Sequence, residues 1–449
     1  MRLLIGPPGP GMTKEILALF RSSADAQLLA PSATMAEHLR RQVARESGFL
    51  RPSRIRTLAR FVDWVTPGLP AVSPAALRLA LEDALADRPP APMAKVAGLP
   101  GFLDSLAALL DELGSAGADA RRLQRHAGGD PVCEAVAGAW SAAEAILARR
   151  GLAQRSARLR AAARRVRAGG VIGGHVLVDG FFSFTEAELE LLDALASQAE
   201  LTVSLPQWDG SDPSAVRLRA RGLRVQAVKD GGAPARRSQF VAPSPAAEAV
   251  EIARRILDLH AGGRPWREIG VVVRVQHPYA GLLESVLERF GIPSRGYFAG
   301  TLGRIAAGRP LIAAVEAALA AGGDSRRPAE WVERIEEAVA AIPKRTIRDG
   351  VPHRRAALWR LSGAAREALS AAVVEAAASL AESPAVPAEV FRKRARTAIG
   401  LAPARAPDDR REVVHVMDVY EARQWTLPVV FVCGLAEGQF PLHHANHPI

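Results

Sequence analysis

The stretch that decides the fold stands at the start of the chain and reads Leu3-Leu4-Ile5-Gly6-Pro7-Pro8-Gly9-Pro10-Gly11-Met12-Thr13, followed by a helix-forming run at residues 14–20. An apolar strand, a glycine-rich turn that closes on Thr and a helix form the order of a phosphate-binding loop, because the amide groups of the turn and the helix N-terminus face the phosphates together. The spacing from Gly6 to Thr13 fits the pattern G-x-x-x-x-G-K-S/T except at one position. The sequence therefore predicts a nucleotide-type α/β fold.

The exception is Met12, which occupies the position of the lysine that would reach the β- and γ-phosphates. Lys14 is no replacement, since two residues further along a helix its side chain is rotated by about 200°. Pro10 also removes an amide N–H from the turn. The vestigial nucleotide site then consists of Gly6, Gly9, Gly11, Met12 and Thr13. The alternative is a Gly/Pro turn that never bound a ligand.

Length and composition limit the classes of protein that this chain can belong to. A chain of 449 residues is long enough for roughly three domains. Hydrophobic residues make up 49% and charged residues 23%, as in globular proteins, and the absence of an apolar run of membrane-spanning length and of a signal peptide predicts a cytoplasmic location. Cys133 and Cys433 lie far apart in apolar surroundings, which predicts two core thiols rather than a disulfide or a metal site.

The formal net charge of +11 and the pI of about 10.5 favour a polyanionic partner. The arginine-rich segment at residues 149–167 is either a solvated helix face or a surface for DNA phosphates. Only five of the basic residues are lysines, so coding bias is an alternative source of the charge. The charge is compatible with nucleic-acid binding and does not by itself establish it.

Apolar runs separated by helical patterns predict two α/β halves with parallel sheets. In the first half, the run His175-Val176-Leu177-Val178 ends in Asp179, where Mg²⁺ coordination opposite a phosphate loop requires a carboxylate. Gly180 follows where an active ATPase usually has a second acid. Thr185 and Glu188 have the spacing of a capping box, and Trp208 follows a strand at the sheet end where ligands of such folds bind.

Two segments of the second half resemble motifs of superfamily 1 DNA helicases of the UvrD/RecB kind. The run Ile269-Gly270-Val271-Val272-Val273-Arg274, with Gly291-Ile292-Pro293 after a helix, resembles the segment that delivers an arginine toward the nucleotide phosphates. The run Gly434-Leu435-Ala436-Glu437-Gly438-Gln439-Phe440-Pro441 resembles the Gly-Leu-x-Glu-Gly-x-Phe-Pro turn of these helicases and is the most specific signal in the chain. The resemblance implies an α/β protein with two RecA-like P-loop parallel-sheet domains, each with an all-helical insertion.

The expected organisation has a first RecA-like domain at 1–72 and 169–210, a helical insertion at 73–168, a junction at 211–238, a second RecA-like domain at 239–303 and 410–449, and a second helical insertion at 304–409.

The run Val178-Asp179-Gly180-Phe181-Phe182, with Phe184-Thr185, resembles more narrowly the AddB subunit family of bacterial helicase–nucleases, in which Asp-Gly-Phe replaces the acidic pair of working helicases. The resemblance implies a partner subunit similar to AddA, a double-strand DNA end as substrate and a role in double-strand break repair by recombination. The nuclease domain and iron–sulfur cysteines of that family would follow Ile449, so the sequence is expected to be a partial product. His443, His444 and His447 are expected in a loop rather than at a metal.

Three departures from working helicases affect the nucleotide site. Met12 replaces the loop lysine, and Gly180 replaces the second acid. Working helicases have a loop that resembles His-x-x-Lys-Gly-Leu-Glu, and in this chain Thr426 stands in the position of its Glu. Arg423 in that loop is expected to keep a basic contact with DNA. The departures together predict an inactivated motor in which Asp179 and Arg274 are vestiges, with no cofactor expected. Retained ATP and Mg²⁺ binding is the alternative.

The sequence thus predicts a DNA-binding, catalytically inactivated helicase-like subunit that guides one strand. The expected DNA contacts are Arg40, Arg41, Arg56, Trp208 and Arg423. Two other functions stay open, namely a weak DNA-stimulated ATPase that uses Thr13, Asp179 and Arg274, and a scaffold that does not touch DNA.

Overall fold

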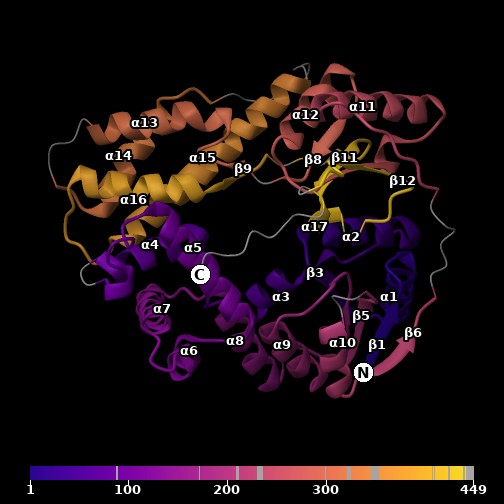
Figure 1. Ribbon diagram of the computed structural model, residues 1–449, viewed down its shortest axis with the longest axis horizontal. Helices are drawn as coiled ribbons and strands as arrows, with labels where there is room; N and C mark the ends of the chain where they lie inside the picture. Colours follow the sequence, from indigo (N-terminus) through magenta and orange to yellow (C-terminus); the bar gives the residue numbers. More distant parts are fainter. Residues whose placement is uncertain are drawn as a thin grey trace.

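The computed structural model describes residues 1–86, 89–170, 172–208, 212–229, 236–298, 300–320, 325–344, 353–406, 408, 410–422, 425–437 and 440. Two sheets and two groups of helices surround the centre of the molecule (Figure 1). One sheet has six strands and the other has four, and both are parallel throughout. The prediction of an α/β protein with two parallel sheets is therefore confirmed.

The first sheet has the strand order β3-β2-β4-β5-β1-β6. Its strands are β1 (Arg2–Gly6), β2 (Gln27–Ala30), β3 (Ile55–Thr57), β4 (His175–Val178), β5 (Glu200–Pro206) and β6 (Arg224–Ala227). The four central strands are almost wholly buried. They appear in the sequence as continuous apolar runs because both faces of a parallel sheet are covered.

Helices cover both faces of this sheet. The helices on one face, α1 (Pro10–Ser22) and α2 (Ala33–Ser47), pack around Phe20 and Leu39. The helices on the other face are α3 (Leu58–Val65), α8 (Arg155–Arg167), α9 (Glu186–Ala196) and α10 (Asp212–Ala220). This two-sided cover leaves the strand ends as the accessible parts of the sheet, and the carboxyl ends are where such folds bind ligands.

Side-chain caps fix where two of these helices begin. The Ser32 hydroxyl accepts a hydrogen bond from the Met35 amide at the start of α2. At the start of α9, Thr185 and Glu188 accept each other's backbone N–H groups, so the predicted capping box is confirmed. The α9 cap lies shortly after Asp179 and fixes the direction in which the chain leaves β4.

The structure differs from the expected organisation of this half at two places. Helix α8, expected in the helical insertion, contributes Leu159 and Val166 to the core of the first sheet. The segment 211–238, expected as a junction, contributes α10 and β6, and β6 pairs with β1. The sequence gives little sign of β6 because all four of its residues are exposed at the sheet edge, so no apolar run is required.

The edge strand explains one glycine of the predicted phosphate loop. A Cβ on Gly6 would lie 2.4 Å from the Val228 carbonyl oxygen, closer than packed atoms approach. We expect Gly6→Ala to lower the free energy of unfolding by about 1–3 kcal/mol, because the chain after β6 must move away from β1. Chemical denaturation measures the change. Gly98, with open space around its Cα, is the control, and an equal effect of Gly98→Ala would contradict the packing role of Gly6.

The first helical group is formed by α4 (Pro74–Ala86), α5 (Pro100–Ser115), α6 (Ala120–His126) and α7 (Pro131–Arg149), with the short 3-10 turn η2 (Ala91–Met93). Its core is built around Trp140, whose indole N–H donates to the Gln154 side chain at 2.9 Å. Cys433 is a buried thiol as predicted, but Cys133 is half-exposed. The prediction of a core thiol is wrong for Cys133 because it lies in the first turn of α7, beside the capping residue Asp130.

The second sheet has the strand order β12-β7-β11-β8. Its strands are β7 (Ile269–Val273), β8 (Ser294–Gly296), β11 (Val414–Asp418) and β12 (Val429–Cys433), with the 3-10 turn η4 (Trp266–Glu268) before β7 and the short helix α17 (Val419–Ala422) after β11. Helices α11 (Pro245–Ala261) and α12 (Tyr279–Arg289) cover one face. On the other face, Met417 and Tyr297 pack with Trp425, toward α2 of the first half.

The second helical group is formed by α13 (Arg309–Ala320), α14 (Pro328–Ala340), α15 (His353–Ser379) and α16 (Ala388–Leu401), with the short 3-10 turn η5 (Ala306–Gly308) before α13. Trp331 and Phe391 are its largest buried side chains. The antiparallel pair β9 (Gly300–Thr301) and β10 (Pro403–Ala404) joins it to the second sheet.

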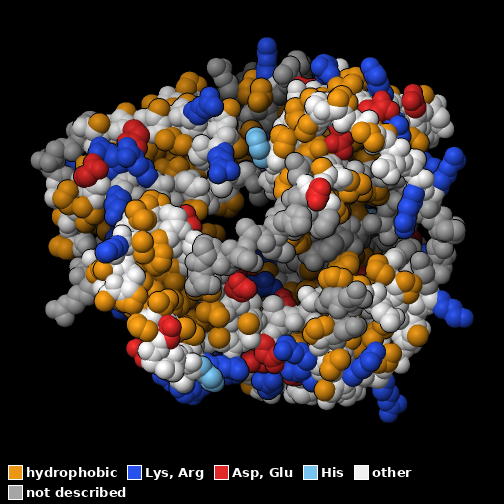
Figure 2. Space-filling view, viewed as in Figure 1, with side chains coloured by type: hydrophobic (Ala, Val, Ile, Leu, Met, Phe, Trp, Pro, Cys, Tyr) orange, Lys and Arg blue, Asp and Glu red, His pale blue; other side chains and the backbone are white. Residues whose placement is uncertain are grey.

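The two sheets and the two helical groups leave a hollow between them, visible in Figure 2 as a dark opening at the centre of the molecule. We call this hollow the central opening. In Figure 1, α17 of the second half lies to the right of the centre of the molecule and α3 of the first half lies below it. None of the described helices is both long and apolar enough to span a membrane.

Candidate functional site

The turn between β1 and α1 lacks most of the groups that hold phosphate. Helix α1 begins at Pro10, so only residues 7–9 separate it from β1. Three of the four residues from 7 to 10 are prolines without an amide N–H, which leaves Gly9 as the one donor among them. Met12 is 6% exposed and points into the protein. The turn therefore presents neither the cation nor the row of amides that phosphate binding requires.

Thr13 and Asp179, the two residues predicted to hold Mg²⁺, lie together and bond to each other. The Thr13 hydroxyl donates to the Asp179 carboxylate at 2.9 Å. Ser204 donates to the other oxygen of the same carboxylate, and the Gly180 amide also contributes a hydrogen bond. Asp179 is 2% exposed. Both carboxylate oxygens of Asp179 thus already accept hydrogen bonds from the protein itself.

The Asp179 carboxyl gives a testable dependence of stability on pH. Burial raises its pKa above the usual value, while hydrogen bonds from Ser204, Thr13 and Gly180 oppose the rise. Because the folded state binds this proton more tightly than the unfolded state, the contribution of Asp179 to stability is largest below its unfolded pKa and is lost as the pH rises through its folded pKa.

We therefore expect the free energy of unfolding of Asp179→Asn, relative to the unaltered protein, to increase between pH 4 and pH 7 as described by linkage. The amide does not titrate, so the variant escapes the loss that ionisation of the buried carboxyl causes. Urea denaturation of both proteins at the two pH values measures the difference. A relative stability that decreases with rising pH would contradict the sign of the pKa shift.

Arg274 lies just after β7, as predicted, and its guanidinium stands over the ring of Tyr420 at 5.2 Å. Tyr420 is 56% exposed and belongs to α17. On the first half, the Arg56 guanidinium stands over the ring of Trp64 at 4.5 Å, and Trp64 of α3 is 45% exposed. Each half therefore carries an arginine–aromatic pair, with the ring on α3 in the first half and on α17 in the second (Figure 1).

The other residues predicted to contact DNA, namely Arg40, Arg41, Trp208 and Arg423, do not share one environment. Arg40 donates twice to the Ile55 carbonyl, at 2.9 and 2.5 Å, and so fastens α2 to β3. Arg41 is ion-paired with Glu37. Trp208 is exposed at the end of β5, with its ring edge toward Phe182. Arg423 lies outside the described residues.

A cleft of about 520 Å³ lies where the two halves meet. It is lined by α1 and α2 from the first half and by residues around β7, β8, β11 and β12 from the second. Lys14, Arg45 and Arg411 line it as exposed cations with which no carboxylate among the described residues is ion-paired. Arg41 and Arg267 also line the cleft, but Glu37 and Glu412 pair with them.

The inner wall of the cleft is aromatic. The rings of His415 and Trp425 have centroids 4.6 Å apart, and Tyr297 and His415 share a hydrogen bond of 2.8 Å. His38 of α2 lies 5.3 Å from the Trp425 ring. Burial, together with Arg45 and Arg41, lowers the pKa of His38, and burial lowers the pKa of His415 to about 4. Both histidines are neutral near pH 7, so the positive charge of the cleft comes from its Lys and Arg side chains. Glu46 and Glu268, which also line the cleft, offset part of that charge.

This cleft was not predicted from the sequence. Its lining comes from segments that are as far apart as Thr13 and Pro428. Only contacts between the two halves, such as the Glu37–Arg295 pair at 3.6 Å, bring these segments together. Lys14 was expected to point away from a phosphate at the β1–α1 turn, and the structure places it in the lining of the cleft. The one signal in the sequence was the pattern of basic residues along α2.

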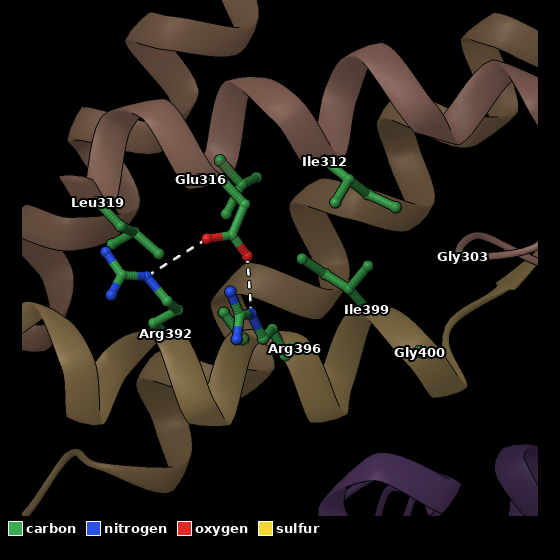
Figure 3. A pocket seen from close by; sticks show the side chains of 10 residues that line it. Gly303, Ile312, Glu316, Leu319, Arg392, Arg396, Ile399 and Gly400 are labelled. Atoms are coloured by element: carbon green, nitrogen blue, oxygen red, sulfur yellow. Dashed lines mark hydrogen bonds and ion pairs between the residues drawn. The ribbon is translucent and has the colours of Figure 1, made fainter.

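A smaller pocket of about 230 Å³ lies between α13 and α16 (Figure 3). Apolar side chains such as Ile312, Leu319 and Ile399 line it. Glu316 accepts from Arg396 at 2.8 Å and pairs with Arg392 at 3.3 Å, and the hydrogen bond from Arg396 is the main reason why the pKa of Glu316 is lowered. Glu389 also pairs with Arg392, so both arginines have carboxylate partners and the pocket is a feature of helix packing.

The described residues contain no group of three or more His, Cys, Asp or Glu side chains that could hold a metal ion. The predicted loop histidines His443, His444 and His447 lie outside that part of the chain. No protein-family model matches the sequence, and no curated protein matches it.

Proposed function

We propose that this chain is a DNA-binding subunit with two RecA-like domains and an inactivated nucleotide site, similar in plan to the AddB subunits of bacterial helicase–nucleases. The observation that carries the proposal is the cleft between the two halves, which is lined by three cations without an ion-pair partner among the described residues and by the half-buried ring of Trp425. Cations bind phosphates without regard to sequence, and aromatic rings stack on bases of any kind. This combination suits a single strand.

The state of the nucleotide site supports binding without ATP hydrolysis. Phosphoryl transfer depends almost entirely on positioned charge, and loss of one cation lowers its rate by orders of magnitude. Met12 supplies no charge, and the Thr13 hydroxyl donates a hydrogen bond to the Asp179 carboxylate. The protein then acts on DNA by holding and guiding it rather than by moving along it.

The arginine–aromatic pairs extend the DNA-binding surface beyond the cleft. Trp64 with Arg56 and Tyr420 with Arg274 combine an exposed ring with a cation. A strand that follows α3 and α17 would meet a stacking surface on each half. An AddA-like helicase–nuclease subunit in the cytoplasm would then supply the motor and the cleavage, with a DNA double-strand end as the shared substrate.

A weak DNA-stimulated ATPase is the second candidate function. The distance of 2.9 Å between Thr13 and Asp179 favours it, because these residues remain close enough to share a metal ion. DNA-stimulated release of phosphate that disappears in Asp179→Asn would establish this function in place of the first.

Titration with fluorescent single-stranded and forked DNA at about 0.05 and 0.2 M salt tests the proposal. Binding that weakens steeply with salt is expected, because counterions leave the strand when cations bind its phosphates. Binding that is absent at both salt concentrations would refute a DNA-binding role and favour a scaffold.

A further inference from the structure

A pocket of about 670 Å³ lies at the edge of the first sheet where β2, β3 and β4 begin. We call it the amino-edge pocket. The side chains in its lining that bear on its chemistry are Asp25, Gln27, Phe49, Arg51, Arg54 and Arg56. Thr13 and Asp179 follow the carboxyl ends of β1 and β4, at the opposite edge of the same sheet. The described residues that line this pocket are different from those that line the cleft between the halves.

The amino-edge pocket carries an excess of positive charge. Among the described residues that line it, three are arginines and Asp25 is the one carboxylate. None of these arginines forms an ion pair within the described part of the chain. Burial and the neighbouring Arg40 lower the pKa of Arg56, as expected for a half-buried cation without a counter-ion. An anion in the pocket would supply that counter-ion.

Arg54 is held in place with one of its nitrogen atoms left over. Its Nε donates to the Ala26 carbonyl at 3.0 Å, and its Nη2 donates to the carbonyls of Phe20 and Ser23 at 3.2 and 2.6 Å. Its guanidinium also stands over the Phe20 ring at 4.3 Å. Nη1 forms no hydrogen bond with the described residues. Because the side chain is already ordered, a ligand that accepts from Nη1 does not have to immobilise it.

Two buried polar atoms beside the arginines lack a hydrogen-bond partner among the described residues, namely Oε1 of Gln27 and Nη1 of Arg56. Arg56 is in register with Leu29, two residues after Gln27, so both side chains stand on the same face of the sheet. Buried polar groups are normally satisfied by the protein, by water or by a ligand. A ligand that suits both atoms accepts a hydrogen bond from Arg56 and donates one to Gln27.

Phe49 adds an aromatic surface to the pocket. Its side chain is 74% exposed, although it is large and apolar. Bases of any kind stack on such rings. A volume of about 670 Å³ is within the range of pockets for small organic ligands and exceeds what a phosphate ion needs. The pocket therefore has room for a base and a sugar as well as for a phosphate.

We propose that the amino-edge pocket binds a nucleotide that carries a phosphate monoester. Arg51, Arg54 and Arg56 hold the phosphate through charge-assisted hydrogen bonds. Phe49 stacks on the base, and Gln27 accepts a hydrogen bond from an N–H group of the base. This site is separate from the turn between β1 and α1, which lacks the groups that phosphate binding requires.

Calorimetric titration of the protein with deoxyadenosine monophosphate, deoxyadenosine and inorganic phosphate tests the pocket. The monophosphate is expected to bind one site per chain with a dissociation constant below about 1 mM, as is usual for a ligand of its size in a formed pocket. Deoxyadenosine and phosphate are each expected to bind at least about tenfold more weakly, because each makes only part of the contacts. Absence of binding, or binding of either fragment as tight as that of the monophosphate, would overturn the proposal.

The variants Arg51→Glu and Phe49→Ala locate the binding, since both side chains are exposed. The first places a negative charge beside the phosphate and the second removes the stacking surface, so each is expected to weaken binding about tenfold. Arg121→Glu makes the same change of charge at an exposed position on α6, outside the pocket, and is expected to have no effect. An unchanged dissociation constant in either pocket variant would mean that the nucleotide binds elsewhere.

Competition distinguishes a free nucleotide from the phosphorylated end of a DNA strand. Displacement of the monophosphate by an oligonucleotide with a 5′ phosphate, but not by the same oligonucleotide with a 5′ hydroxyl, would identify the strand end as the ligand. Displacement by neither would identify the free nucleotide. Equal displacement by both would overturn recognition of a phosphate monoester. Only the strand end rests on the proposed function, so a protein that binds the monophosphate and no DNA would refute that function and leave the pocket standing.

Discussion

Replacing Met12 with lysine restores the pattern of a phosphate loop in the sequence, yet it is expected to lower stability and not to create nucleotide binding. Met12 is 6% exposed, so the new ammonium group has to be buried or has to distort the first turn of α1 to reach water. Burial of an unpaired charge is among the most destabilising changes known, and a loss of about 2–4 kcal/mol in the free energy of unfolding is expected. Chemical denaturation measures the loss.

Ala18→Lys is the matched control because Ala18 is exposed on the same helix. It adds the same side chain and is expected to change stability by less than about 0.5 kcal/mol. Calorimetric titration of Met12→Lys with Mg-ATP tests the second half of the expectation. Tight binding of Mg-ATP with unchanged stability would mean that the lysine alone was missing from a working loop.

Removing the three cations of the cleft that have no ion-pair partner in the described part of the chain is expected to have the largest effect on DNA binding. The variant Lys14→Gln, Arg45→Gln, Arg411→Gln leaves the paired Arg41 and Arg267 in place. For single strands, each phosphate contact contributes about −0.7 to the slope of log K against log salt, so loss of three contacts predicts roughly 50-fold weaker binding at 0.15 M salt. The slope itself is expected to become shallower by about 2.

The control removes the same charge from the first helical group through Lys95→Gln, Arg121→Gln and Arg125→Gln. These side chains are exposed and lie outside the cleft. Net charge falls equally in the two variants, so any difference between their affinities comes from position rather than from total charge. Equal weakening by both would show that DNA binds through the overall charge and not through the cleft.

The sequence was sufficient to predict the strands that are buried on both faces of their sheet. The strands β4 and β11 are apolar runs because helices or side chains cover both faces, and their carboxyl ends are where Asp179 and Tyr420 follow. The edge strand β6 was missed because its residues are all exposed and carry no apolar pattern. Helix α8 was assigned to the helical insertion because its arginines hide the narrow apolar stripe that packs on the first sheet.

The site was predictable only where its residues follow strands of the same sheet, as Thr13 follows β1 and Asp179 follows β4 on the two sides of β5. The proximity of Thr13 and Asp179 follows from the order of a parallel sheet, whose carboxyl ends meet at one edge. Their hydrogen bond to each other, the burial of Met12 and the bonding of Arg40 to a backbone carbonyl depend on packing that no local pattern encodes. The cleft depends on the docking of the two halves, which residue spacing does not reveal.

The most direct test of nucleotide-independent DNA binding is the affinity of the protein for fluorescent single-stranded DNA with and without Mg-ATP, at two salt concentrations. The expected result is an affinity that falls steeply with salt and is the same with and without Mg-ATP, because the Thr13–Asp179 hydrogen bond stays closed and Met12 supplies no charge. An affinity that changes with Mg-ATP would contradict nucleotide-independent DNA binding, since it would mean that the turn between β1 and α1 still binds a nucleotide.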